Sequence, residues 1–135
     1  MSDLSTLKKA LPEMEHSFSL IEEVGSLTKM PFSGNFSCRI TNLKTQAQID
    51  KLRASLNEGL SDLSAGTKQL HAMIAHLRYA LTDSPKWWKE ADHGYDLLDY
   101  NLVQKVYDKV IEFENKWYDE VWGDKKEESK DASKA

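Results

Sequence analysis

The chain has 135 residues, of which 40% are apolar and 30% are charged, a balance typical of one globular domain and not of a disordered chain. Its net charge is −4, and no basic stripe that could neutralise phosphates or anionic lipid heads occurs along the sequence. Nucleic acids and membranes are therefore not expected partners. The sequence shows neither the apolar core of a signal peptide nor a run of about 20 apolar residues that could span a bilayer. We therefore expect a cytoplasmic protein. Its single cysteine, Cys38, excludes an intrachain disulfide and a four-thiolate metal site.

The first 43 residues divide into two segments. Residues 1–25 form a variable N-terminal segment in which Leu4, Leu7 and Leu11 recur at helical spacing until Pro12 interrupts them, and this predicts one short helix. Residues 26–43 form a strand region, because Phe36, Cys38 and Ile40 alternate with polar residues after a turn-like run at 31–35. The strand is expected to pair in a small hairpin with residues 18–24.

A helical hairpin is predicted next. Thr45 is a plausible N-cap for a helix that ends before Gly66 and carries the apolar residues Ile49, Leu52, Leu56, Leu60 and Leu63. A second helix is expected from Thr67 to Asp83, with one apolar stripe made by Leu70, Met73, Ile74, Leu77 and Leu81.

Two further helices and a tail follow. Ser84 and Pro85 are typical of an N-cap and a first helical position, so a short helix should carry Trp87 and Trp88 and end at Gly94. The last helix should begin at Asp99 or Asn101 and run to about Val121, with the strongest apolar periodicity of the chain. Residues 124–135 hold four acids, four lysines and no large apolar side chain, which predicts a disordered tail.

The predicted fold class is therefore mainly α, a small helical domain with a short N-terminal β-strand or hairpin. Residues 1–123 form a single domain, with the variable segment 1–25, the strand region 26–43 and a helical core over 45–122. The tail over 124–135 lies outside it.

Catalytic chemistry finds little support. The six glycines are scattered, so no phosphate-binding loop is formed, and no Gly-x-Ser-x-Gly nucleophile motif occurs. Cys38 in an alternating apolar row is more typical of a core residue than of a nucleophile. His71 and His76 lie five residues apart, whereas paired zinc ligands on a helix lie four apart. We expect no enzyme activity, no cofactor and no metal; the weakest alternative is a metal-dependent hydrolase using these two histidines, His93 and nearby aspartates.

Aromatic residues are concentrated in the last third, where nine of the thirteen lie between Trp87 and Trp122. One interpretation is that they form the core of a small domain. The adjacent pairs Trp87/Trp88 and Trp117/Tyr118 favour another, because neighbours on a helix point about 100° apart and rarely bury together. Exposed rings are common anchors of protein interfaces. The candidate partner-binding residues are Trp87, Trp88, Tyr107, Phe113, Trp117 and Tyr118.

Four motifs follow one another between Gly34 and Trp117. A strand of the form Phe-x-x-Arg-x-x-x-Leu over 36–43 precedes a helical region. It is followed by Leu-Arg-x-Ala-Leu-x-Asp-Ser-Pro-x-Trp-Trp over 77–88, and by a loop with tyrosine and aspartate over 95–99. The last helix carries Val-x-x-Val-Tyr-x-x-Val-x-x-Phe-Glu-x-x-Trp over 103–117. In the order and separation of these elements the stretch resembles the tail assembly chaperones of long-tailed (siphovirus-type) bacteriophages, in their short form. Residues 1–25 add nothing to the resemblance.

The resemblance implies a non-enzymatic role. Such a chaperone binds the long helical tape measure protein, assists polymerisation of the tail tube protein around it, and acts in the host cell cytoplasm without entering the finished virion. The chain looks like the short form, to which a frameshift would append a second domain. The main alternative is another acidic helical protein-binding module, such as an immunity protein or a secretion chaperone. Homo-oligomer formation is left open by the sequence.

Overall fold

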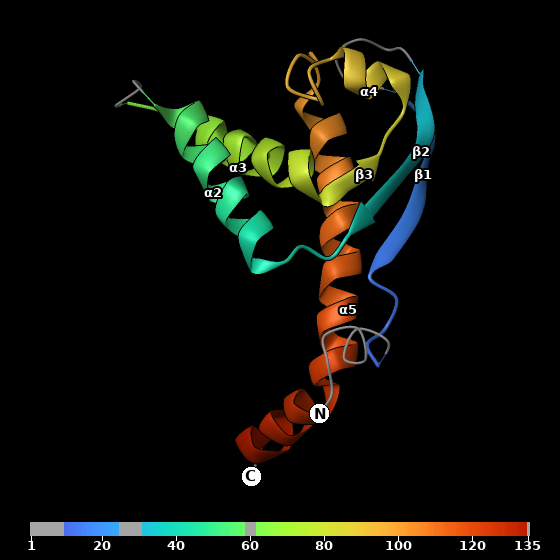
Figure 1. The fold of residues 1–135 in the computed structure, drawn as a ribbon, viewed down its shortest axis with the longest axis vertical. Coiled ribbons are helices and arrows are strands. Elements are labelled where there is room, and N and C mark those ends of the chain that lie inside the picture. Colours follow the sequence, from blue (N-terminus) through green and yellow to red (C-terminus); the bar gives the residue numbers. More distant parts are fainter. Residues whose placement is uncertain (1–9, 25–30, 59–61, 135) are drawn as a thin grey trace.

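The computed structural model of the chain describes residues 10–24, 31–58 and 62–134 (Figure 1). In chain order its elements are strands β1 (Glu15–Val24) and β2 (Pro31–Arg39), helices α2 (Leu43–Asn57) and α3 (Ala65–Ala80), strand β3 (Leu81–Asp83), and helices α4 (Lys86–Glu90) and α5 (Tyr100–Lys134). The described residues are mostly helical and hold a three-stranded antiparallel sheet in the order β1-β2-β3. The sheet is larger than the strand or hairpin expected from the sequence. Most of the predicted N-terminal helix lies outside the described residues.

The hairpin of β1 and β2 confirms the pairing expected between residues 18–24 and the strand around Phe36. The strands are antiparallel, with Phe18 opposite Phe36 and His16 opposite Cys38. The run at 31–35 that we expected to be a turn lies inside β2 instead. Its glycine serves close packing, because a Cβ at Gly34 would lie only 2.3 Å from the Pro85 Cγ.

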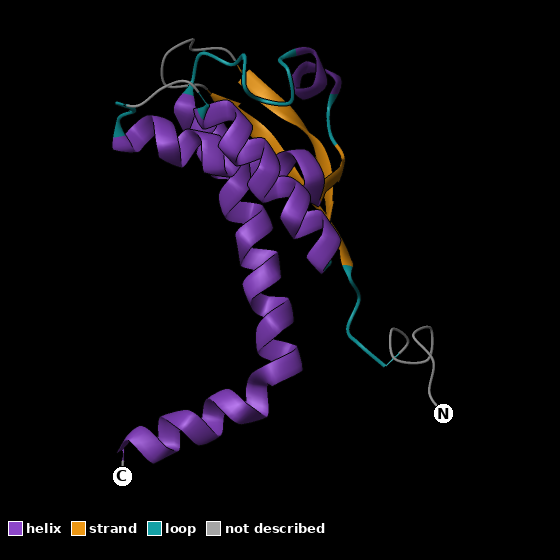
Figure 2. Ribbon diagram, turned by 60° about the vertical axis from the view of Figure 1, so that its left-hand side comes forward, coloured by secondary structure: helices purple, strands orange, loops and turns teal. Residues whose placement is uncertain are grey.

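The two faces of the hairpin differ as its alternation requires. Leu20, Phe36 and Cys38 are buried on the face that meets the helices. On the other face the hydroxyl oxygens of Ser17 and Ser37 lie 2.9 Å apart and share a hydrogen bond. Helices α3 and α5 cover the apolar face of the sheet (Figures 1 and 2). The polar face lies on the opposite side.

Helix α2 begins three residues earlier than its predicted cap implied. The N–H of Thr45 donates to the Asn42 side-chain oxygen at 2.8 Å, so Asn42 is the N-cap and Thr45 lies in the first turn. The helix ends at Asn57, before Leu63, and α3 begins after its own N-cap, Ser64. Helix α2 packs against α3 as the expected helical hairpin.

Strand β3 was not expected, because Leu77 and Leu81 continue the helical spacing of α3. The helix ends at Ala80, and the next three residues pair with β2, with Leu81 opposite Cys38 and Asp83 opposite Ser37. This pairing gives backbone groups at the edge of β2 hydrogen-bond partners that a longer helix would not supply.

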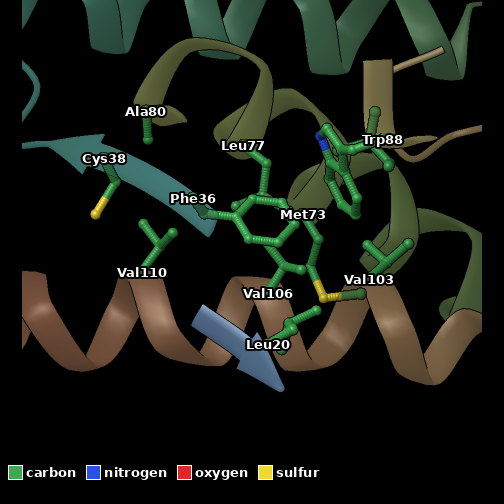
Figure 3. Packing of buried hydrophobic residues seen from close by; sticks show 11 residues of the cluster. Leu20, Phe36, Cys38, Met73, Leu77, Ala80, Trp88, Val103, Val106 and Val110 are labelled. Carbon is green, nitrogen blue, oxygen red and sulfur yellow. The ribbon is translucent and has the colours of Figure 1, made fainter. Parts of the chain in front are cut away.

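The core lies where the hairpin meets α3, α4 and α5 (Figure 3). Phe36 lies at its centre and is completely buried. Side chains from each neighbouring element surround it: Leu20, Cys38, Met73, Ile74, Leu77, Ala80, Trp88, Val103, Val106 and Val110. The valines of α5 show that the predicted apolar periodicity of the last helix faces this core.

Helix α5 begins as predicted, since the N–H of Asn101 donates to a carboxylate oxygen of Asp99 at 3.0 Å. It does not end near Val121 but continues to Lys134, through the segment for which the sequence predicted disorder. Alanine, lysine and glutamate there favour helix, and extending an existing helix avoids the cost of nucleation. Figure 2 shows this last part bending away from the rest of α5. Within the described ranges, no helix is long and apolar enough to cross a membrane.

Candidate protein-binding groove

A groove of about 450 Å³ lies between the start of β1 and the middle of α5. We call it the β1–α5 groove. Its α5 wall consists of Lys109, Glu112, Phe113, Lys116, Trp117 and Glu120. Its opposite wall consists of Pro12, Glu13, Glu15, His16 and Phe18. The segment just before β1 is paired with the end of β2, because Ile40 donates its N–H to the Met14 carbonyl oxygen at 2.8 Å and so extends the hairpin.

Four rings line the groove. His16 stacks on Phe113 with ring centroids 4.9 Å apart, and Phe18 stacks on Phe36 of the core at 5.3 Å. The indole N–H of Trp117 donates to the Pro12 carbonyl oxygen at 3.2 Å and so links the two walls. The rings are thus held by contacts within the protein, and a partner would meet a largely pre-formed surface.

Charged side chains form the rims of the groove. Among the residues that the structure describes, the charged side chains on the β1 side are the carboxylates of Glu13 and Glu15, whereas the α5 side carries two lysines and two glutamates. All six are exposed. Four carboxylates against two ammonium groups give the groove an acidic character, which favours a basic partner.

The structure brings together two of the six predicted partner-binding residues, Phe113 and Trp117, in this groove. Phe113 is half-buried, and Trp117 is only 8% exposed, so Phe113 offers the larger contact surface. Tyr118 lies beside them on the next face of α5, 37% exposed, with its ring perpendicular to that of Trp117. Trp122, one turn further along, is 49% exposed.

The Trp87/Trp88 pair does not form a partner surface. Trp88 is completely buried in the core and cannot contact another protein in the folded state. Trp87 is half-buried, and its indole N–H donates to the Ser33 carbonyl oxygen at 2.8 Å. Both rings pack edge-on against Phe36. The prediction that one ring of each pair lies nearer the surface holds, but here the outer ring fixes α4 to β2.

Tyr107 lies apart from the groove, facing α3. Its ring packs edge-on against His76, which bonds to Glu114 with Nε2 and Oε2 2.5 Å apart. Burial, followed by the negative charges of Glu114 and Asp108, raises the pKa of the Tyr107 hydroxyl. Tyr107 therefore belongs to the contact between α3 and α5.

His71 and Cys38, which were considered for catalysis, are buried inside the domain. His71 is buried, with its ring nitrogens 2.6 Å from the Asn57 side-chain oxygen and 2.7 Å from the Tyr95 hydroxyl. In the described part of the chain, no three histidine, cysteine or acidic side chains are grouped so that they could hold a metal ion. Burial, with a smaller contribution from Glu114, raises the pKa of the Cys38 thiol to about 11, so the reactive thiolate is scarce near neutral pH.

Sequence reasoning missed the β1 wall of the groove. The two-residue spacing of His16 and Phe18 could have placed both on one face of the predicted strand. No local signal could have brought that face to Phe113, because the contact joins segments almost a hundred residues apart.

Comparisons of this chain with protein-family models, with curated protein sequences and with solved structures found no match.

Proposed function

We propose that this protein is a tail assembly chaperone of the long-tailed bacteriophage type, which binds the tape measure protein and assists polymerisation of the tail tube. The observation that carries the proposal is the β1–α5 groove. Phe113 and Trp117, which close the terminal motif of the resemblance, both line it. Half-buried rings between charged rims favour contact with another protein.

The geometry suits reversible binding of a long helical client. A groove whose apolar surface comes mainly from two half-buried phenylalanines, Phe18 and Phe113, offers a limited contact, so each copy would bind weakly. Many copies along one client would together hold it through multivalency, while each remains easy to displace. The charged rims would keep the free chaperone soluble in the host cytoplasm. Release before the tail is complete would leave the chaperone absent from the finished virion.

Co-expression with the tape measure protein encoded by the same genome tests the proposal. We expect the tape measure protein to shift from the insoluble to the soluble fraction and to co-purify with this chain. An unrelated long coiled-coil protein of similar length is the matched control and should gain neither solubility nor association.

Two outcomes would contradict the proposal. Unchanged solubility of the tape measure protein, with no complex on size-exclusion chromatography, would remove the chaperone function. Equal rescue of the unrelated coiled coil would show a general helix binder, closer to a secretion chaperone than to a dedicated tail chaperone.

A further inference from the structure

The α5 wall of the β1–α5 groove has the form of a helix-packing face. Its six residues recur at steps of three and one, from Lys109 to Glu120, and lie within a sector of about 140° at 100° per residue. Phe113 and Trp117 occupy the edge of this sector nearest the core, and the four charged residues occupy the edge nearest solvent. A second helix could therefore lie along α5 with its apolar side chains against the rings.

The two rims differ in charge. In the described part of the β1 rim the charged residues are Glu13 and Glu15, both negative, while lysine and glutamate alternate along the α5 rim. Arg39 lies opposite Glu15 in the hairpin, but its guanidinium donates to the Tyr79 carbonyl oxygen at 3.4 Å. A partner helix with basic residues along one side of its apolar stripe would match the β1 rim, and an acidic helix would be repelled there.

We infer that the β1–α5 groove binds an amphipathic helix of another protein whose apolar stripe is bordered by lysine or arginine on the side facing Glu13 and Glu15. The inference rests on the proposed function for the nature of the client, and it adds the site and the charge that the client segment must carry. Phe113 contacts the apolar stripe, His16 supports the Phe113 ring from the β1 side, and the two glutamates select the basic border.

Synthetic helical peptides of about 20 residues test the site directly. Two peptides share one leucine stripe and differ only in the residues beside it, lysine in one and glutamate in the other. Calorimetry with the full chain should give a Kd at least about tenfold lower for the lysine peptide. Raising the salt concentration from about 0.05 M to about 0.5 M should weaken that binding, because the charges on the rims are exposed and screened.

Variants then locate the binding. The double substitution Glu13→Gln/Glu15→Gln should weaken binding of the lysine peptide by about tenfold. Glu58→Gln/Asp62→Asn is the matched control: it removes the same number of exposed charges outside the groove and should leave the Kd unchanged. Thermal unfolding of both variants should match that of the unaltered chain, since all four carboxylates are exposed.

The outcomes separate this inference from the proposed function. Equal affinity for the two peptides, or equal losses in the two variants, would overturn the groove assignment even if the tape measure protein still co-purifies. A dimer detected by light scattering and abolished by Glu13→Gln/Glu15→Gln would show a second copy as the occupant and would also overturn it. Selective binding of the lysine peptide, without association with the tape measure protein, would support the groove and reject the phage client.

Discussion

Replacing Trp88 by alanine should destabilise the whole domain rather than affect partner binding alone. The indole is completely buried, with its ring 5.5 Å from that of Phe36 and in an edge-on orientation. An indole buries about 150–250 Å², which at about 25 cal/mol per Å² gives about 4–6 kcal/mol as an upper bound. Tryptophan-to-alanine changes in cores typically cost about 3–5 kcal/mol, a large part of the about 5–15 kcal/mol that stabilises an ordinary domain.

Urea unfolding followed by far-ultraviolet circular dichroism measures this cost, because the helical signal does not depend on the removed indole. Tyr118→Ala is the control, since its ring is 37% exposed and its loss should cost less than about 1 kcal/mol. If Trp88→Ala costs no more than Tyr118→Ala, Trp88 is not the core residue that the structure shows.

A second substitution tests the geometry around the same ring. Gly94 has a φ of 93°, and a Cβ there would lie 2.5 Å from the Trp88 Cη2. Gly94→Ala should therefore cost more than about 1 kcal/mol, from backbone strain and from the clash. In the Trp88→Ala background the clash disappears and only the strain remains, so the two costs should be less than additive. Strict additivity would show that the two residues do not touch.

Two further predictions concern buried polar groups. The pKa of the Cys38 thiol is about 11 in the folded chain against an ordinary 9.0, so its contribution to stability is full below pH 9.0 and is lost as the pH rises to about 11. Between about pH 8 and about pH 10.5, the Cys38→Ala variant should therefore lose less stability in urea titrations than the unaltered chain. An equal loss would contradict the raised pKa of the Cys38 thiol. His76→Ala leaves Glu114, 15% exposed, without its partner and should cost about 1–3 kcal/mol in urea unfolding. Lys86→Ala breaks the exposed pair with Glu90 and should cost less than about 1 kcal/mol; equal costs would argue against a partly buried His76–Glu114 pair.

The elements that could be predicted from sequence are those set by local periodicity. The alternation through Phe36 and Cys38 located the hairpin, and the spacing of the valines located the buried face of α5. Strand β3 could not be predicted, because three residues carry no period of their own and exist as a strand only through β2. Asn42 and Thr45 are both good capping residues, and only the backbone path shows which one caps α2.

The candidate site was predicted only on its α5 side. Phe113 and Trp117 were selected as exposed rings on the last helix, and both line the groove. Trp88 was selected for the same reason but belongs to the core. Periodicity shows that neighbours on a helix face different ways, and it does not show which one faces inward. That depends on how α4 lies on β2, where Pro85 packs beside Gly34.

The placement of α5 also determines when this chain can fold. The hairpin and α3 pack against Val103, Val106 and Val110, and these valines are synthesised long after Phe36. During translation the apolar face of the hairpin therefore lacks its cover from α5 until the first third of that helix, which carries the valines, has left the ribosome. A nascent chain stalled before Val103 should be open to proteases and to cellular holdases, and protection should arrive in one step once the valines emerge.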